Sequence, residues 1–404
     1  MESAVGGIEN ISFASNAGLF PNTPDLDTST FTLPTALQMT DYLEYRISVG
    51  LVKYVSPIIL IVGTFGNVMS FAVLRTRAFR GCPVAFTLSA LAIVDTSVLY
   101  TSLLRQWLLS LTDKELDVRV VFWSVGCKVH MLLTYYLQQL SSWTLVVLTV
   151  ERSCCVCLPL LAKTFCTRSK VRLLWAAIVL LFLFINAHFL WTAEYALQPR
   201  NEWVNETSLI CYIGPRFHAF FYDVWYWLDF TLVSVLPFIF ILTGNIVIIA
   251  SIVRGAKFRL ELHQHPVSSS AAAATTSKAI PRYSTMTSST AMLIGVSAMF
   301  FLTTTPSTAY FLLADQFLSN PSAQCEARVQ LAFAATNLLY YTNNAVNFLL
   351  YCLTGTRFRR ALVSVFQKRG NEAAELRTRD LKSNTMDSTP MAKSKLYTAV
   401  EKRS

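Results

Sequence analysis

The residues with the clearest capacity for chemistry are charged side chains inside long apolar stretches. Asp95 follows the apolar run 88–94 and lies in a stretch that is otherwise free of charge. An isolated carboxylate in such surroundings is costly and needs polar partners. Ser141, Asn343 and Asn347 lie in other apolar stretches and could supply hydroxyl and amide groups. We therefore expect a buried polar cluster around Asp95.

A second charged pair, Glu151 and Arg152, stands at one end of another apolar stretch. Adjacent helix residues do not face each other, but their long side chains can meet at a membrane surface, where ion pairs are poorly screened. One interpretation is an ion pair that locks this end of the helix. The other is a pair of side chains that extend to the interface and only mark the edge of the membrane.

The stretches that carry these residues predict the architecture. Only 14% of the 404 residues are Asp, Glu, Lys or Arg, against about 25% in an ordinary soluble domain. Hydrophobic residues make up 53%, and mean hydropathy is +0.44, which excludes a disordered, fibrous or cytosolic protein. Seven stretches have the length of about 20 residues that a membrane-crossing helix needs, and they cover 54–74, 84–104, 129–150, 173–193, 230–253, 283–314 and 329–356. Continuous apolar runs indicate helices and not barrel strands, so we expect an all-α membrane protein, a seven-transmembrane helix bundle.

Charge in the connecting loops predicts the orientation. Lys and Arg are enriched after the first, third, fifth and seventh stretches, whereas Asp and Glu are enriched in the amino-terminal segment and the opposite loops. Cytoplasmic loops carry the excess of Lys and Arg. We therefore expect a multi-pass plasma-membrane protein with an extracellular amino terminus and a cytoplasmic carboxyl terminus. The net charge of +10 is then a topology signal, and no nucleic-acid partner is expected.

The same pattern divides the chain into four regions. They are an extracellular segment over 1–47, the transmembrane bundle over 48–354, an amphipathic helix at the inner membrane surface over 355–368, and a disordered cytoplasmic tail over 369–404. Phe358, Leu362 and Val365 recur at helical spacing among arginines, which is typical of an interfacial helix. Sequons at Asn10 and Asn205 fall on the expected outer side and predict glycosylation.

Three of the nine cysteines fall on the expected outer side: Cys127, Cys211 and Cys325. Three pairings among them are open. A bond between Cys127 and Cys211 would fasten the long loop after the fourth stretch over the mouth of the bundle, and Cys325 would then stay a thiol or pair with nothing in this chain. The other six cysteines lie toward the reducing cytosol and are expected as thiols.

Sequence features on successive stretches resemble those of the rhodopsin-like (class A) G-protein-coupled receptors over about 48–368. In chain order they are Gly66-Asn67, Leu88 to Asp95, Glu151-Arg152-Ser153, Trp175, Pro237, Pro306 and Asn347-Phe348-Leu349-Leu350-Tyr351. The chain also looks similar to invertebrate neuropeptide receptors of the FMRFamide- and myomodulin-like kind. This resemblance implies the seven-helix fold and a receptor function.

The sequence departs from the family pattern at three places. Glu151-Arg152-Ser153 stands for Asp-Arg-Tyr, and the acid–arginine pair is retained. Asn347 to Tyr351 lacks the proline of Asn-Pro-x-x-Tyr, so no proline kink is expected in the seventh helix. Thr303-Thr304-Thr305-Pro306 replaces Cys-Trp-x-Pro, so the family's tryptophan is absent.

The resemblance implies roles for several polar residues. An allosteric sodium ion, the one cofactor expected, would bind at Asp95, Ser141, Asn343 and Asn347. A disulfide would join Cys127 and Cys211. The switch for G-protein activation would consist of Glu151, Arg152, Pro306, Asn347 and Tyr351. Pro306 would be either a hinge for the sixth helix or a static kink.

The ligand pocket implied by the resemblance lies between the outer thirds of the helices. Its expected residues are Arg105, Gln106, His130, Thr134, Tyr135, Gln138, Tyr226, Asp229, Phe230, Ser307, Phe311, Phe333, Asn337 and Tyr341. Thr134 stands where amine receptors carry an acid, and Tyr341 stands where opsins carry the retinal-binding lysine, so monoamines and retinal are disfavoured. Acidic outer segments would concentrate a cationic ligand, and Asp229 could pair with an arginine. A short, basic, amidated neuropeptide fits best.

Three functions compete at this stage. The first is a peptide-activated receptor that signals through a heterotrimeric G protein, with arrestin, a receptor kinase and membrane lipids as further partners. The second is a chemosensory receptor of the same fold for a small environmental molecule. A transporter is disfavoured, because neither internal repeats nor paired broken helices are visible. No phosphate loop, metal-ligand spacing or nucleophile motif indicates an enzyme.

Overall fold

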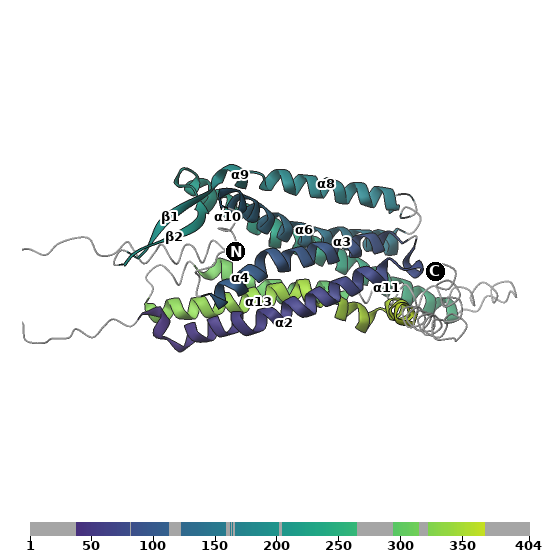
Figure 1. Ribbon diagram of the computed structural model, residues 1–404. Helices are drawn as coiled ribbons and strands as arrows, with labels where there is room; N and C mark the ends of the chain where they lie inside the picture. The colour runs from purple at the N-terminus through teal and green to yellow at the C-terminus, as the bar shows by residue number, and fades with distance from the viewer. Residues whose placement is uncertain are drawn as a thin grey trace, which may run out of the picture. The chain divides into compact units, whose positions relative to one another are not determined.

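The computed structural model describes residues 38–80, 82–112, 123–158, 162, 164, 166–201, 204–264, 294–314 and 322–367, which are mostly helical (Figure 1). The longest labelled helices are α2 (Leu43–Leu74), α3 (Pro83–Val98), α6 (Trp123–Cys157), α8 (Arg168–Asn186), α11 (Leu236–Gln264) and α13 (Ala323–Thr354). Further helices cover Ile294–Ala314 and 356–367. Single-turn helices lie at η1 (Met39–Asp41), η2 (Arg77–Phe79), η4 (Pro215–Phe217) and α9 (Phe189–Thr192).

Six helices of the described residues are long and apolar enough to cross a membrane. They are Leu43–Leu74, Val84–Leu111, Trp123–Cys157, Arg168–Thr192, Phe220–Lys257 and Ile294–Ala314. The seventh expected span corresponds to α13, which has 32 residues but is less apolar, because it buries several asparagines. The helices also extend past the apolar stretches that predict them, since backbone hydrogen bonding continues beyond the hydrocarbon core. The expected all-α bundle is confirmed.

Close backbone packing joins α2 to α13, which lie side by side (Figure 1). A Cβ atom at Gly63 would lie 3.0 Å from the Cβ of Ala345, and one at Gly66 would lie 2.9 Å from the Cβ of Phe348. Small residues let membrane helices approach in this way. The approach brings Asn67 close enough to donate to the main-chain oxygen of Asn344 at 3.1 Å.

Three π-helical turns interrupt the spans, at η3 (Leu99–Leu103), η5 (Phe220–Trp225) and η6 (Thr231–Val235). The turn η3 joins α3 to α4 (Leu104–Leu111), and α10 (Tyr226–Phe230) lies between η5 and η6. Pro237 follows η6 and has no backbone N–H to donate to a carbonyl inside it. One helical hydrogen bond is therefore missing there. Such turns are frequent at functional sites. The expected ligand residues of the fifth span, Tyr226, Asp229 and Phe230, lie on α10 between η5 and η6.

A β-hairpin follows α9 and consists of β1 (Ala193–Asn201) and β2 (Val204–Ile213), which pair antiparallel. Cys211 on β2 forms a disulfide with Cys127 on α6, with 5.5 Å between their Cα atoms. The predicted pairing is therefore confirmed, and Cys325 is not part of it. The six cysteines expected toward the cytosol are thiols. Burial raises the pKa of the Cys166 thiol, which favours its protonated form.

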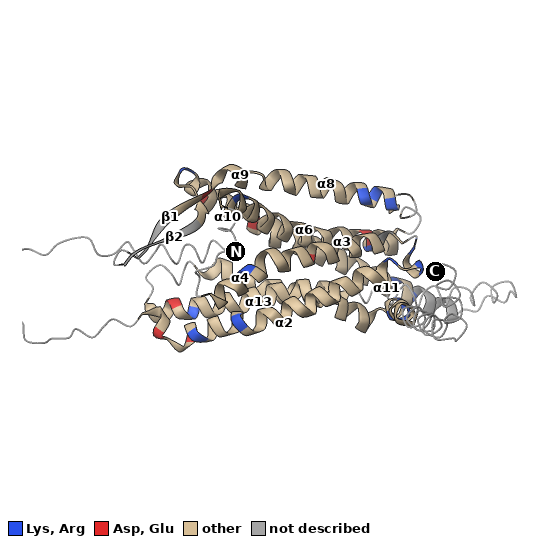
Figure 2. Ribbon diagram, in the orientation of Figure 1, with Lys and Arg blue, Asp and Glu red and all other residues tan. Residues whose placement is uncertain are grey.

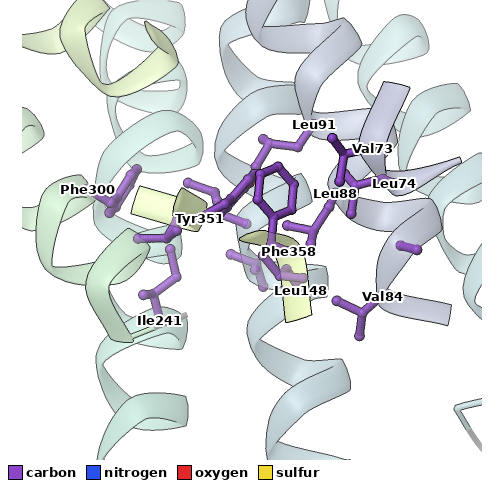
Figure 3. Close-up of a cluster of buried hydrophobic side chains, with 14 of the residues drawn as sticks. Val73, Leu74, Val84, Leu88, Leu91, Leu148, Ile241, Phe300, Tyr351 and Phe358 are labelled. Atoms are coloured by element: carbon purple, nitrogen blue, oxygen red, sulfur yellow. The ribbon is translucent and has the colours of Figure 1, made fainter. Parts of the chain in front are cut away.

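Basic residues gather at the end of the bundle where α3 and α8 begin, whereas acidic and basic residues mix at the other end (Figure 2). An apolar cluster fills the basic end (Figure 3). It unites residues from α2, α3, α6, α11, α13 and the helices Ile294–Ala314 and 356–367, including Leu88, Leu148, Ile241, Phe300, Tyr351 and Phe358. Seven helices are thereby joined at one point.

Candidate functional site

The Asp95 carboxylate lies at the centre of a polar cluster formed by three helices. Asp95 is on α3 and is only 1% exposed. Ser141 of α6 donates to its Oδ1 at 2.6 Å, and Asn344 of α13 donates to the same oxygen at 2.9 Å. Asn347 of α13 donates to Oδ2 at 2.8 Å. Both carboxylate oxygens are therefore satisfied, which offsets part of the cost of burying the group.

Asn344, and not Asn343, is the partner of Asp95 on this part of α13. The expectation for Asn343 is wrong in this respect, because no hydrogen bond joins it to Asp95 among the described residues, and its buried Oδ1 has no partner there. Asn344 also donates to Ser141 Oγ at 3.2 Å. Asn344 and Asn347 are one helical turn apart and share the face of α13 that looks toward α3 and α6.

The donor set around Asp95 fits a small hard cation. Carboxylate, hydroxyl and amide oxygens are the ligands that such ions prefer. The amide oxygens of Asn67 and Asn344 are buried and have no hydrogen-bond donor among the described residues. An oxygen without a donor in a dry environment is a cost that a cation would relieve.

Glu151 does not form the expected ion pair with Arg152 among the described residues. Glu151 is 4% exposed, and Thr87 of α3 donates to its Oε2 at 2.6 Å. Successive residues on α6 point in different directions, so Glu151 faces α3. Arg152 instead lines a cleft between α2, α3 and the start of the helix 356–367. Its Nε is buried and has no partner among the described residues.

The other expected switch residues close the same end of the bundle. Tyr351 is 1% exposed, and its ring lies 5.5 Å from that of Phe358 (Figure 3). The helix α13 runs without interruption through Asn347 and Tyr351, as expected for a motif without proline. Around Pro306 the helix Ile294–Ala314 is also continuous, and Thr304 donates back to the carbonyl of Phe300 at 2.5 Å. Such back-bonding favours a bend near Pro306.

Polar expected ligand residues meet between α4, α6 and α13. Asn337 donates to Gln106 Oε1 at 2.8 Å, and Gln106 Nε2 lies 3.5 Å from the Tyr341 hydroxyl. On the facing side, His130 Nε2 is 2.8 Å from the carbonyl of Thr101. Thr101 belongs to the π-helical turn η3, so this turn contributes a polar contact to the group.

Other expected ligand residues hold helices together. Tyr135 stacks on Phe189 with 4.7 Å between ring centroids. Ser307 donates to the carbonyl of Thr336 at 2.8 Å, and Tyr226 donates to the carbonyl of Phe311 at 3.3 Å. The remaining ones are buried or half-buried on the same helices: Arg105, Thr134, Gln138, Phe230 and Phe333.

Asp229 on α10 is a further carboxylate within a membrane span, and its partners lie on other helices. Gln139 of α6 donates to its Oδ1 at 2.8 Å, and Asn186 of α8 donates to Gln139 Oε1 at 2.7 Å. Sequence reasoning missed Gln139 and Asn186, as it missed Thr87 and Asn344. The sequence does show polar residues inside apolar stretches. It does not show which faces of the helices contact one another.

With this geometry in place, comparison with known proteins identifies the family. A family model described as "7 transmembrane receptor (rhodopsin family)" matches residues 66–351. Because this match covers well over half of the chain, the protein belongs to the rhodopsin family of seven-transmembrane receptors. It is thus a multi-pass membrane receptor and not an enzyme.

The relatives found include thyrotropin-releasing hormone receptors from three animals. The Gallus gallus protein is 28% identical over 179 residues, 44% of this chain and 42% of that protein. The Mus musculus protein is 28% identical over 204 residues, 49% of each chain. The Bos taurus protein is 27% identical over 345 residues, 79% of this chain and 80% of that one. The chain thus spans less than half of the length of the first two, and the likeness to FMRFamide- and myomodulin-like receptors stays a prediction.

Several predictions concern residues beyond this description. Asn10, the amino-terminal segment over 1–37, the loop 265–293 and the tail over 368–404 lie outside the described residues. Asn205 lies on β2, but its side chain is outside the description. Glycosylation at both sequons stays a prediction.

Proposed function

We propose that the protein is a receptor for an extracellular peptide and signals through a heterotrimeric G protein. The observation that carries this proposal is membership of the rhodopsin family together with relatives named as receptors for a releasing hormone. The polar expected ligand residues on α4, α6 and α13 support a ligand with several hydrogen-bonding groups. Asp229 supports a basic one, and we expect it to be a short amidated peptide.

The proposed orientation places the disulfide-bonded hairpin outside and the basic end of the bundle in the cytosol. Lys and Arg at that end support this orientation. The disulfide on β2 supports it too, because disulfides persist in the oxidising extracellular space. The cleft beside Arg152 then faces the cytosol, where a G protein would bind after the apolar cluster rearranges.

A sodium ion is proposed at the Asp95 cluster. Asp95, Ser141 and the amide oxygen of Asn344 would hold it, with Asn347 on the second carboxylate oxygen. The ion would supply a fixed positive charge that favours the packed arrangement of α3, α6 and α13. A ligand that favours another arrangement would then oppose sodium binding, because such coupling is reciprocal.

Further partners are proposed for the cytoplasmic side. Hydroxyl residues of the tail would accept phosphate from a receptor kinase, and the added charge would attract arrestin. The helix 356–367 places Phe358 and Ala361 in the apolar cluster and carries arginines on exposed positions, which supports a place at the lipid surface.

The experiment that tests this function is a calcium and cAMP assay in cells that express the receptor. Thyrotropin-releasing hormone and a library of short amidated peptides are applied, with small environmental chemicals as a separate arm. A peptide response that Arg152→Ala abolishes, while surface expression and peptide binding persist, supports the proposal. A response to small chemicals alone, or full signalling by Arg152→Ala, contradicts it.

A further inference from the structure

The Asp229 carboxylate belongs to a chain of three polar side chains that crosses from α8 through α6 to α10. Asn186 and Gln139 are both fully buried, at 0% exposure. Asn186 donates to Gln139, and Gln139 donates to Asp229. Two fully buried amides and a half-buried carboxylate within the membrane spans are retained only at a cost, so this set of residues needs an explanation beyond packing.

The donor-to-acceptor direction of these hydrogen bonds is fixed at the Asn186 end. Asn186 Nδ2 also donates to the carbonyl of Phe182 at 2.8 Å. A carbonyl can only accept, so the amide nitrogen of Asn186 must face it, and its second hydrogen is directed to Gln139 Oε1. Gln139 must then present its own nitrogen to position 229. The site is therefore built for an acceptor, and an ionised carboxylate is the strongest acceptor available.

Gln139 occupies only one of the two carboxylate oxygens. Among the described residues no protein group donates to Asp229 Oδ2, and Asp229 is half-buried. Its carboxylate lies on the side of α10 that faces α6, because Gln139 of α6 donates to it. A carboxylate with one oxygen fixed and one open is oriented to receive a cation.

We propose that Gln139 and Asn186 are positioning residues that hold Asp229 as the acceptor for a guanidinium group of the extracellular ligand. The inference rests on the proposed function, because it requires a ligand that enters from outside. It goes further by assigning charge selectivity to two residues that do not touch the ligand. Without them, Asp229 would lose a fixed donor, and its free oxygen would lose a fixed direction.

The test uses fragments, so it does not depend on finding the natural peptide. The full-length receptor is purified in lipid nanodiscs, and its thermal unfolding midpoint is titrated with L-argininamide and with L-citrullinamide. These two probes share every group except guanidinium against neutral urea. A hydrogen bond to a charged group contributes about 1.5–3 kcal/mol, which corresponds to about a 10- to 150-fold change in affinity. We therefore expect wild-type receptor to prefer L-argininamide at least tenfold.

The variants separate positioning from folding. Asp229→Asn keeps the acceptor for Gln139 and should bring the preference close to one. Gln139→Met and Asn186→Leu match their residues in size and should each lower the preference at least threefold, whereas a purely structural role would lower the unfolding midpoint and leave the preference unchanged. If one of them does not fold, the other gives the answer. Asp223→Asn, at an exposed acid in η5, is the matched control and should keep the wild-type preference.

Three results would overturn the proposal: no preference in the wild-type receptor, the same preference in Asp229→Asn, or the wild-type preference in every folded variant among Gln139→Met and Asn186→Leu. The outcome is distinguishable from failure of the peptide proposal. If no peptide activates the receptor but the guanidinium preference depends on Asp229, the peptide proposal is rejected and this site is retained. If a peptide activates the receptor and its potency is unchanged by substitution of Asp229 or Gln139, this site is rejected and the peptide proposal is retained.

Discussion

The hairpin end and the basic end of the bundle, which we propose as its outer and inner ends, are held together by different kinds of contact. At the outer end, a disulfide ties the hairpin to α6, and hydrogen bonds such as that from Asn337 to Gln106 join α13 to α4. At the inner end, Tyr351 and Phe358 pack in an apolar cluster (Figure 3). Covalent and directional contacts hold one geometry, whereas apolar contacts can be exchanged for others at small cost.

This difference matches what a receptor needs at each end. A binding site gains affinity when its geometry is fixed before the ligand arrives. In the proposed orientation the basic end faces the cytosol and has to adopt two arrangements, and a ligand shifts their populations only by its unequal affinity for them. The contrast predicts that changes at the outer end abolish binding, whereas changes at the inner end alter signalling.

The largest effect is expected from breaking the disulfide. Cys127→Ala and Cys211→Ala should each remove a bond that closes a separation of 84 residues, at a cost of about 2–5 kcal/mol. Surface expression or peptide binding should fall at least tenfold, and equally in the two variants, as measured by flow cytometry and ligand binding. Cys325→Ala serves as the control. Wild-type binding by either variant would contradict the claim that the disulfide fixes the geometry of the hairpin end.

Removal of the central ring of the inner cluster should come next. Phe358→Ala deletes a buried aromatic side chain, which typically costs about 3–5 kcal/mol. We expect a several-fold rise in ligand-independent signalling with little change in peptide affinity, measured by basal second messenger and binding. Phe366→Ala, at an exposed position of the same helix, is the control. Lost binding with unchanged basal signalling would contradict the division between the two ends.

A smaller effect is expected at the Asp95 cluster, which lies between the two ends. Sodium should lower agonist affinity in the wild-type receptor, because the ion favours the arrangement without agonist. Asp95→Asn should remove this dependence, because it removes the charge that attracts the ion. Agonist binding is measured in sodium chloride and in choline chloride at equal ionic strength. Identical titrations of the two forms would reject the ion site.

The smallest effect is expected from Thr87→Val. Loss of the 2.6 Å bond to Glu151 should cost about 1–3 kcal/mol, because it leaves a buried acceptor unsatisfied. The unfolding midpoint should drop by a few degrees. Thr96→Val is the matched control on α3, since Thr96 donates only to its own helix, at Ala92. Equal midpoints for the two variants would show that Glu151 does not depend on Thr87.

Which features could be predicted depended on how local their cause is. The apolar stretches predict the spans because crossing a membrane requires length and hydropathy, and α13 shows the limit of that rule. Asp95 could be found because a charge inside a span is conspicuous by itself. Its partner Asn344 could not be separated from Asn343, since the choice depends on how α13 is rotated against α3 and α6. The same reason explains why Glu151 bonds Thr87 and not its neighbour Arg152.

The sequence alone determined that the chain crosses the membrane repeatedly, that one end is basic, and that Asp95 is a charge inside a span, because these properties follow from composition and spacing. The tertiary structure decided which of those residues meet. Ser141 and Asn347 reach Asp95, and Gln139 reaches Asp229, through helix rotations that are fixed by packing across the whole bundle. Contacts between helices depend on the relative positions of distant segments, and no local pattern contains that information.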